Sequence, residues 1–166
     1  MVNLSKSIIL VNIQSQKMKL STRAQYGTRA LLDLAIHGNG KPVQLKDIAQ
    51  RQNISLHYLE HLITPLIGAG IITSLRGAHG GIRLARPHHE IELSEVVKLL
   101  EGSIAPVECI NSPGVCSRSE FCATRDVWGE LGEAMNVVLK STTLQDLVKR
   151  QKIKEPPGEV ANMYYI

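Results

Sequence analysis

The chain has 166 residues, 43% of them hydrophobic and 20% charged, which is enough to bury the core of one domain and excludes a wholly disordered protein. Its formal net charge is +4, and no apolar run approaches the roughly 18 residues that would cross a membrane. Three cysteines with no secretory signal before them argue against a disulfide framework, so we expect a protein of the reducing cytoplasm.

The small net charge hides a division of the chain into two halves. Residues 1–90 carry eleven Lys and Arg against four Asp and Glu, while residues 91–166 carry eight against eleven. A basic first half followed by an acidic second half indicates a module that binds a polyanion, joined to a partner-binding or sensing module. A chance difference between two solvated surfaces would explain the same numbers.

The N-terminal part of the chain predicts an extension and a first helix. Residues 1–17 lack periodicity, so we expect a disordered or extraneous extension, and the organised sequence begins at Met18. From Ser21 to Ile36, apolar residues recur at steps of three and four, which predicts an amphipathic helix. Ser21 can cap its start, and Gly38 and Gly40 can end it.

The next segment predicts a helix-turn-helix at about residues 45–68. Leu45, Ile48 and Ala49 share one face of a short helix, and Asn53 begins a turn before the N-cap Ser55. The second helix carries an apolar stripe. Its members are Leu56, Leu59, Leu62, Ile63, Leu66 and Ile67. Two short amphipathic helices joined by a tight turn are typical of this motif.

A β-hairpin follows at about residues 71–85. Two β-prone runs flank the glycine-rich connector that begins at Arg76. A basic hairpin directly after a helix-turn-helix is the wing of a winged-helix domain, which we place at residues 18–102. The predicted fold class is therefore mainly α, with a small β-hairpin wing and, in the second half, a long helix.

The second half predicts two further helical regions around a loop. Ser94 is expected to cap a helix that ends at Gly102, and the aperiodic segment 103–123 is expected to be a loop. Apolar spacing predicts a long helix over 124–140, and Thr143 can cap a short last helix ending near 150. Residues 151–166 are expected to form a polar C-terminal tail.

The first turn of the second helix in a helix-turn-helix reads base edges in the major groove. Here its polar side chains include His57, Glu60 and His61, and Glu60 can only accept hydrogen bonds, for instance from cytosine N4. Arg76 at the wing can enter a narrow minor groove, and Lys19 and Arg23 can meet phosphates. A plain solvated helix face is the alternative explanation.

The three cysteines follow the spacing C-x6-C-x5-C within one loop. Cys109, Cys116 and Cys122 do not complete a four-ligand zinc site, and all six histidines lie at or before residue 89. An iron–sulfur cluster with a non-cysteine fourth ligand and three unligated thiols both remain open. The chain has no nucleophile elbow, Walker loop or HExxH motif, so we do not expect an enzyme.

Several short segments carry a family resemblance. They are Lys19-Leu20-Ser21-Thr22-Arg23, Tyr26-Gly27, Ile54-Ser55-Leu56 with Tyr58-Leu59-Glu60, and Arg76-Gly77-Ala78 with Gly80-Gly81. Through them the chain, from about Met18 to Lys149, resembles the winged-helix regulators of the Rrf-two family, typified by IscR, NsrR and CymR. The resemblance implies a homodimeric transcription factor that binds palindromic double-stranded DNA, with the helix 124–140 crossing that of its partner.

The groove geometry and the resemblance together give a set of expected DNA contacts. These are Lys19, Arg23, Tyr26, Ser55, His57, Tyr58, Glu60, His61, Arg76 and His79.

The resemblance also implies a cofactor. Cys109, Cys116 and Cys122 fall where IscR-like members hold an iron–sulfur cluster, with 2Fe-2S favoured and 4Fe-4S as the alternative. Two departures leave the fourth ligand open: the first cysteine gap is one residue longer, and Arg125 stands where those members have a histidine. The candidate fourth ligands are Glu108, Glu120, Asp126 and Gln25 of the partner subunit.

The end of the chain is similar to the aromatic-Tyr-Ile end of CymR-type members. The likeness implies that Tyr164, Tyr165 and Ile166 dock on cysteine synthase, with the terminal carboxylate entering its active site. Without the likeness, packing on the protein's own dimer surface is the simpler explanation.

The resulting interpretation is a repressor of genes for iron–sulfur cluster assembly, cysteine metabolism or both, which senses through an iron–sulfur cluster. A change in the cluster loop would alter how the dimer presents its two reading helices. The alternative is a CymR-like repressor gated by cysteine synthase, with the cysteines as redox thiols. A thiol enzyme or a zinc-only module is the third class.

Overall fold

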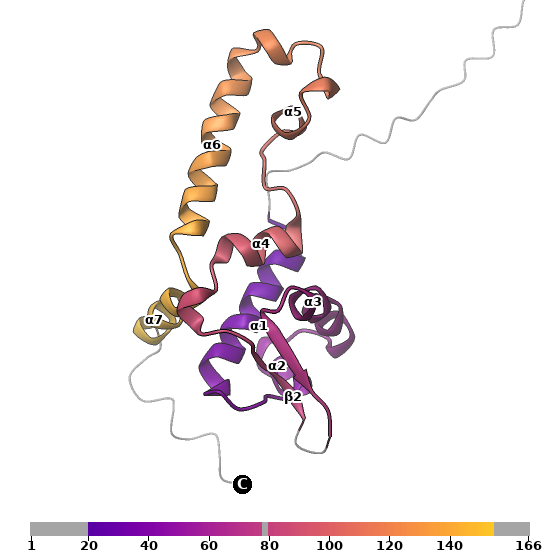
Figure 1. Ribbon diagram of the computed structural model, residues 1–166, viewed down its shortest axis with the longest axis vertical. Coiled ribbons are helices and arrows are strands. Elements are labelled where there is room, and N and C mark those ends of the chain that lie inside the picture. Colours follow the sequence, from indigo (N-terminus) through magenta and orange to yellow (C-terminus); the bar gives the residue numbers. More distant parts are fainter. Residues whose placement is uncertain (1–19, 78–79, 155–166) are drawn as a thin grey trace, which may run out of the picture.

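The computed structural model describes residues 20–77 and 80–154, where the amphipathic patterns become helices around one β-hairpin (Figure 1). The main elements are α1 (Thr22–Gly38), α2 (Leu45–Gln52), α3 (Leu56–Gly68), β1 (Ile72–Leu75), β2 (Gly81–Leu84), α4 (Leu93–Glu101), α5 (Glu108–Asn111), α6 (Ala123–Lys140) and α7 (Leu144–Lys154). Short 3-10 turns are η1 (His88–Glu90), η2 (Pro113–Val115) and η3 (Ser119–Phe121). The extension 1–17 and the predicted site residues Lys19, His79, Tyr164, Tyr165 and Ile166 lie outside the described residues.

Helix α1 runs through the middle of the winged-helix part. Ser21 caps it as predicted, because its side chain accepts a hydrogen bond from the Ala24 amide. The helix extends two residues past the predicted end: Gly38 is helical, and Asn39 takes the left-handed conformation (φ 42°) that ends it. A Cβ on Gly27 would collide with the side chain of Leu100, so glycine is what lets α1 and α4 approach closely.

The helix-turn-helix and the hairpin form as predicted, with one addition. Strands β1 and β2 pair antiparallel, with Ile72 opposite Leu84 and Leu75 opposite Gly81. Val43 makes two further hydrogen bonds to Ile82, one in each direction at 2.8 Å, on the free edge of β2. This bridge ties the wing to the segment between α1 and α2, so the hairpin is held from both sides.

The hydrophobic core lies among α1, α2, α3, α4 and the base of the hairpin. Leu31, Leu59, Leu66 and Val96 are fully buried there, and Leu144 of α7 joins the same cluster. Apolar burial of this kind is the main term that stabilises a small domain. The core therefore belongs to the winged-helix part and to the first turn of α7.

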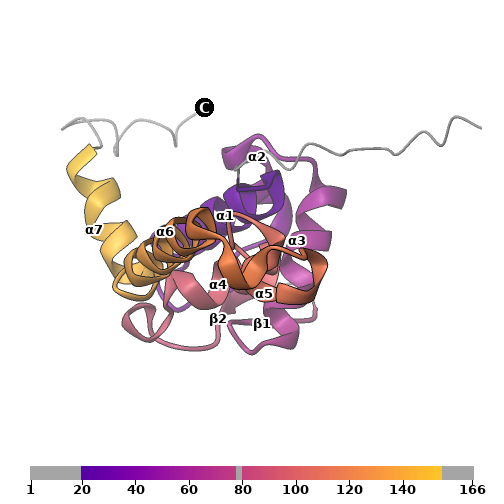
Figure 2. The same cartoon turned by 90° about the horizontal axis from the view of Figure 1, so that it is seen from above.

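Residues 102–142 form a projecting arm, which rises from the winged-helix part in Figure 1. One side of the arm is α6, which has no buried residue, and the other side is the cysteine-containing segment with α5, η2 and η3. The chain then returns beside its point of departure, because Leu93 N–H donates to the Thr142 carbonyl and Leu144 N–H to the Ile91 carbonyl, both at 2.9 Å. Figure 2, seen from above, shows α7 on the side away from α3.

Three local expectations are corrected. Glu92, not Ser94, occupies the N-cap of α4, and Ser94 lies inside the first turn with its hydroxyl bonded to the Glu92 carboxylate. Segment 103–123 is not a plain loop, since one helical turn and two 3-10 turns follow one another there. Helix α7 continues to Lys154, so the tail begins later than residue 151.

No helix among the described residues is long and apolar enough to span a lipid bilayer.

Candidate nucleic-acid interface and cysteine loop

The first turn of α3 presents polar side chains to solvent. The Ser55 hydroxyl caps the helix by accepting from the Tyr58 amide at 3.3 Å. Leu59, Leu62, Ile63 and Leu66 bury one face, so the opposite face is exposed. The predicted base-reading residues His57, Glu60 and His61 all lie on that exposed face.

Tyr58 has a different environment from these neighbours. Its ring is half-buried and meets the Tyr26 ring edge-on, with centroids 6.2 Å apart, and its hydroxyl lies 3.3 Å from the Thr22 hydroxyl. The Arg29 guanidinium stands 5.4 Å from the Tyr26 ring centroid. Tyr26 and Tyr58 therefore join the start of α1 to the start of α3, so both predicted contacts also fix the angle between the two helices.

A buried carboxylate on α1, which the sequence analysis did not single out, holds α2 to α1 through hydrogen bonds. The side chain of Asp33 is fully buried and receives hydrogen bonds from Arg51 and Gln52, the shortest from Arg51 Nη2 at 2.6 Å. Gln52 in turn accepts from Arg29 through its side-chain and backbone oxygens. An acidic residue on the apolar face of a predicted helix was the available signal, because a buried carboxylate requires a partner.

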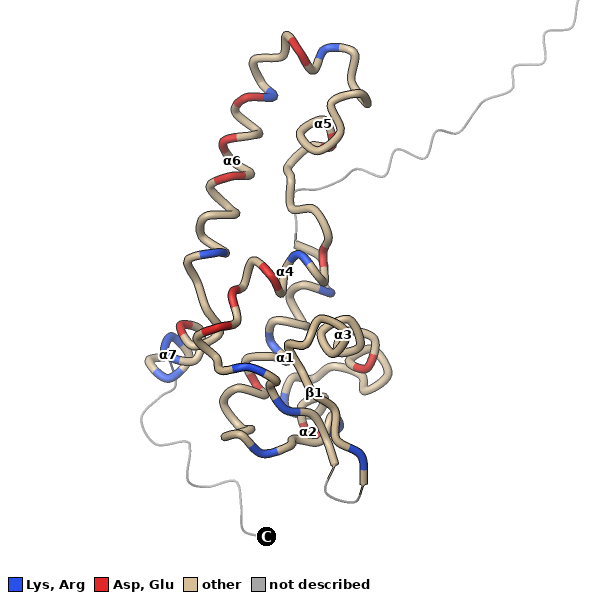
Figure 3. Tube along the Cα trace, in the orientation of Figure 1, with Lys and Arg blue, Asp and Glu red and all other residues tan. Residues whose placement is uncertain are grey.

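The wing adds positive charge beside α3. Arg76 follows β1 and is exposed, and Arg83 on β2 is exposed as well. Arg83 was not among the predicted contacts, although the alternation of Ile82, Arg83 and Leu84 places it on the outer face of the strand. Figure 3 shows many of the Lys and Arg residues on the winged-helix part and on α7, and Asp and Glu along much of α6.

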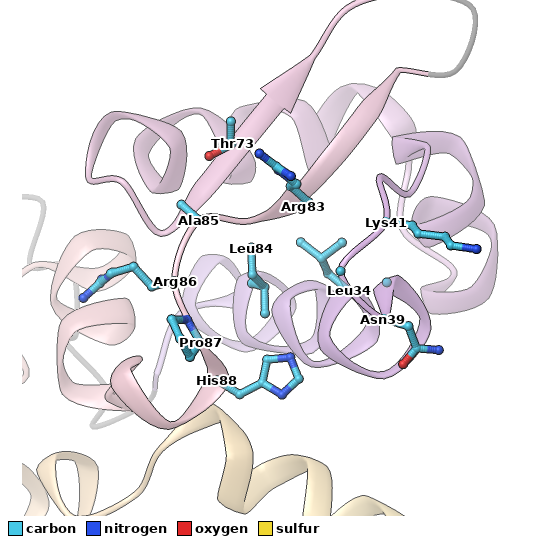
Figure 4. Close-up of a pocket in the computed structure, with 12 residues that line it drawn as sticks. Leu34, Asn39, Lys41, Thr73, Arg83, Leu84, Ala85, Arg86, Pro87 and His88 are labelled. Carbon is cyan, nitrogen blue, oxygen red and sulfur yellow. The ribbon is translucent and has the colours of Figure 1, made fainter.

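A cavity of about 440 Å³ opens where α1 ends and the wing begins. Figure 4 shows Leu34, Leu84 and His88 among the side chains that line this cavity, with Lys41 toward one edge. Arg86, another lining residue, is neutralised by Glu95 at 2.8 Å. Leucine side chains of α1 and β2 and the cations Lys41 and Arg83 therefore line the same cavity beside the wing.

The three cysteines lie at the far end of the arm. Cys109 is in α5, Cys116 follows η2, and Cys122 is the N-cap residue of α6; all three are free thiols of intermediate exposure. Arg125 donates from Nε to the Cys109 carbonyl at 3.1 Å and from Nη1 to the Ser119 carbonyl at 3.4 Å. Arg125 therefore ties the cysteine-containing segment to the first turn of α6.

Cys122 has an altered acidity. The Thr124 hydroxyl lies 3.1 Å from its sulfur, and this hydrogen bond lowers the pKa of the Cys122 thiol, with a smaller contribution from the backbone of Arg125. A thiolate is the form that ligates metal.

The cysteine loop fits an iron–sulfur cluster in chemistry but not in this conformation. Thiolates are the ligands that such clusters use. However, no three His, Cys, Asp or Glu side chains within the described part of the chain come together as a metal-binding group. Glu108, Glu120 and Asp126 therefore do not complete a ligand set with the cysteines here.

A helix-turn-helix with a packed wing, an exposed polar first turn on α3 and a basic surface defines a winged-helix DNA-binding protein. The sequence profile of the Rrf2 family, described as an iron-dependent transcriptional regulator, matches residues 20–150. The chain belongs to this family, whose members bind DNA and act as dimers. It is thus a transcriptional regulator and not an enzyme.

Individual relatives agree with this assignment. The chain is 52% identical over 132 residues to protein rrf2 of Nitratidesulfovibrio vulgaris, covering 80% of this chain and 88% of that protein. It is 43% identical over 131 residues to the HTH-type transcriptional regulator CymR of Bacillus subtilis, covering 78% and 89%.

Solved structures give the same picture. The B. subtilis CymR structure, described as that of the global cysteine regulator, has a TM-score of 0.68 at 39% identity and covers 80% of this chain and 97% of that one. The structure of T. potens IscR has a TM-score of 0.69 at 38% identity, covering 84% and 93%. The resemblance inferred from the sequence motifs is confirmed.

Proposed function

We propose that this protein is a cytoplasmic homodimer that binds a palindromic operator, with α3 in the major groove and the wing against the adjoining minor groove. The observation that carries this proposal is the exposed polar first turn of α3, fixed to α1 through Tyr26 and Tyr58 and flanked by the basic wing. The proposed contacts are Lys19, Arg23, Tyr26, Ser55, His57, Tyr58, Glu60, His61, Arg76 and His79, to which the structure adds Arg83 as a candidate.

The proposed dimer forms through α6. An 18-residue helix without a buried residue is incomplete by itself, and Val127 and Val138, about three helical turns apart on one face, are both exposed. Exposed apolar side chains at helical spacing favour packing against a second helix. A second copy of α6 supplies such a surface, and two copies of α3 then meet a two-fold symmetric site.

DNA binding is tested on a duplex that the full-length protein selects from a random library. Arg76→Ala is expected to weaken binding to all sequences and to reduce the salt dependence, while Glu60→Ala should relax the choice of sequence. Losing one groove contact costs about 1–3 kcal/mol. Glu90→Ala, which removes an exposed glutamate in η1, is the matched control for Glu60. If both variants bind selected and random duplexes as the parent does, the groove assignment is wrong.

The regulated genes in this proposal are those of iron–sulfur cluster assembly, cysteine metabolism or both, which the protein represses. The signal is an iron–sulfur cluster, 2Fe-2S in preference to 4Fe-4S, held by Cys109, Cys116 and Cys122 with an open fourth ligand. The iron-dependent description of the family and the relatives named IscR support this reading. Binding by all three thiols requires the loop to rearrange, because no three potential ligands come together among the described residues.

An anaerobic preparation tests the cluster. Visible absorption with iron and sulfide in matching amounts supports it, whereas colourless protein with stoichiometric zinc contradicts it. Because Arg125 holds the loop closed through two backbone carbonyls, Arg125→Ala should change the rate of cluster uptake, with Arg118→Ala as a control on the same loop.

A second candidate function follows the CymR relationship. Here the repressor is gated by cysteine synthase, which binds Tyr164, Tyr165 and Ile166, and the cysteines act as redox thiols. The 43% identity to CymR supports this candidate. The test mixes the protein with cysteine synthase: a co-eluting, inhibited complex that O-acetylserine displaces and that is lost on deleting Ile166 supports it. A complex that survives the deletion, or none at all, contradicts it.

A further inference from the structure

Two histidines on the exposed face of α3 lie unusually close together. His57 Nε2 and His61 Nε2 are 3.2 Å apart, and the two ring centroids are separated by 4.6 Å. The residues are four positions apart on a helix, which places their side chains on one face. Both rings are exposed, so solvent and ions reach them freely.

From this geometry we propose that His57 and His61 form a binding site for a divalent transition metal ion such as Zn²⁺. Neutral imidazole nitrogen is a preferred ligand for zinc, copper and nickel, and paired histidines at this spacing bind zinc in other helices. With metal–nitrogen bonds of about 2.05 Å, the observed nitrogen separation of 3.2 Å gives a nitrogen–metal–nitrogen angle of about 100°. That angle lies between the octahedral and tetrahedral values.

Glu60 provides the accompanying carboxylate. Its Oε2 atom lies 4.0 Å from His57 Nδ1, the nitrogen that faces away from the shared site. Ligating histidines commonly donate their other N–H to a carboxylate, which fixes the ring and makes the ligating nitrogen more basic. A small rotation of the exposed Glu60 side chain completes this contact. Water supplies the remaining metal ligands, since no third His, Cys, Asp or Glu among the described residues joins the pair.

The site has a consequence for regulation, and this part rests on the proposed function. The two nitrogens that bind the metal are the groups that α3 would offer to base edges, so metal and operator compete for them. By thermodynamic linkage, Zn²⁺ must weaken operator binding by the same factor by which the operator weakens Zn²⁺ binding.

The direct test measures Zn²⁺ binding to full-length protein in which all three cysteines are replaced by serine, so that thiols do not contribute. His57→Ala and His61→Ala should each weaken binding by at least about tenfold, because even loss of an outer-shell partner costs roughly 10–100-fold. The matched control is His89→Ala, which removes an exposed histidine that also lies beside a glutamate, with His89 Nε2 3.7 Å from Glu90. Equal binding by all three variants and the parent overturns the site.

A second measurement guards against loss of folding in the variants. Binding to the native state alone raises the melting temperature, so in the same cysteine-to-serine background Zn²⁺ should stabilise the parent and His89→Ala but not His57→Ala or His61→Ala. Equal stabilisation of all four proteins contradicts the proposal. Repeating the Zn²⁺ titration with the selected duplex bound then tests the competition separately. If the Zn²⁺ affinity is unchanged with DNA bound, the regulatory role is contradicted but the metal site is not. If the protein does not bind DNA at all, the proposed function fails, while the Zn²⁺ titration of the free protein still tests the metal site.

Discussion

The winged-helix part and the arm differ in how far they bury their hydrophobic side chains. Every buried hydrophobic residue in the described chain lies in the winged-helix part or in α7, and α6 contributes none although it is the longest helix described. The winged-helix part, together with the first turn of α7, buries its own hydrophobic core. The arm is held at its base by backbone pairing and exposes apolar side chains along its length. The core that folds the domain and the exposed helix through which we propose that it dimerises therefore lie in separate segments, so substitutions can disturb one without the other.

The largest expected effect comes from a core substitution set against one on the arm. Leu31→Ala should lower the free energy of unfolding by about 2–5 kcal/mol, because Leu31 is 0% exposed and its loss leaves a cavity. Val138→Asp, at a side chain 62% exposed, should leave the helical signal intact and shift the dimer toward monomer. Urea unfolding and sedimentation measure the two effects. Unfolding of the Val138→Asp protein would show instead that α6 contributes to the stability of the folded monomer.

The second effect concerns the buried ion pair. Asp33→Asn should lower the free energy of unfolding by about 2 kcal/mol, since hydrogen bonds to a charged group contribute roughly 1.5–3 kcal/mol and Arg51 keeps partial access to solvent. Asp126→Asn on the arm is the control and should change stability by less than about 0.5 kcal/mol. Urea denaturation at fixed protein concentration tests both variants. Equal effects at the two positions would mean that Asp33 does not hold α2 to α1.

The third effect lies at the junction of the two regions. Thr143 and Asp146 cap α7 reciprocally, since each side chain accepts from the other residue's amide. Thr143→Ala should cost about 1 kcal/mol, the usual value of an N-cap. The hydrogen bonds from Thr143 also lower the pKa of the Asp146 carboxyl, with Lys149 adding to the shift.

This cap has a defined pH dependence. Because the folded pKa is lowered, the stabilisation is present above the ordinary carboxyl pKa and is lost as the pH falls through the lowered value. The stability difference between parent and Thr143→Ala should therefore shrink in acid. Thermal melts across that pH range measure it. Asp146→Asn should remove the same pH dependence, and a difference that grows in acid would contradict the capping role.

The smallest expected effect is on the loop. Single Cys→Ala changes at positions 109, 116 and 122 should each alter the free energy of unfolding by less than about 0.5 kcal/mol, because all three thiols lie outside the core. Each should abolish visible absorption by a cluster. Urea unfolding measures the change in stability, and an anaerobic spectrum measures the loss of the cluster. Loss of the dimer or of helical signal would instead make the cysteines structural.

The periodic parts of the fold could be predicted from sequence. The apolar stripes of α1, α2 and α3 gave helices whose ends agree within about two residues, because burying one face requires that spacing. The turns within 103–123 could not be found this way, since a helix such as Glu108–Asn111 is too short to show a period. The Val43–Ile82 bridge also escaped prediction, because it joins backbone groups far apart in the chain.

The candidate site could be predicted only in part. The spacing of His57, Glu60 and His61 was enough to place them on one exposed face of α3. The same spacing did not reveal that the two histidine nitrogens lie in contact, because that depends on side-chain rotamers. Nor did it reveal that Asp33 bonds Arg51, since an acid on an apolar stripe shows that a partner is needed but not which one.

The backbone pairing beside Thr143 makes the arm an insertion within an otherwise continuous domain. The chain departs at Gly102 and returns to the start of α4, so α7 completes the same globule that α1 began. The arm can therefore be exchanged or lengthened in evolution without changing the winged-helix part. The 18 residues of α6 rise about 27 Å at 1.5 Å per residue, so this helix separates Cys122 at its start from the winged-helix part by about that length.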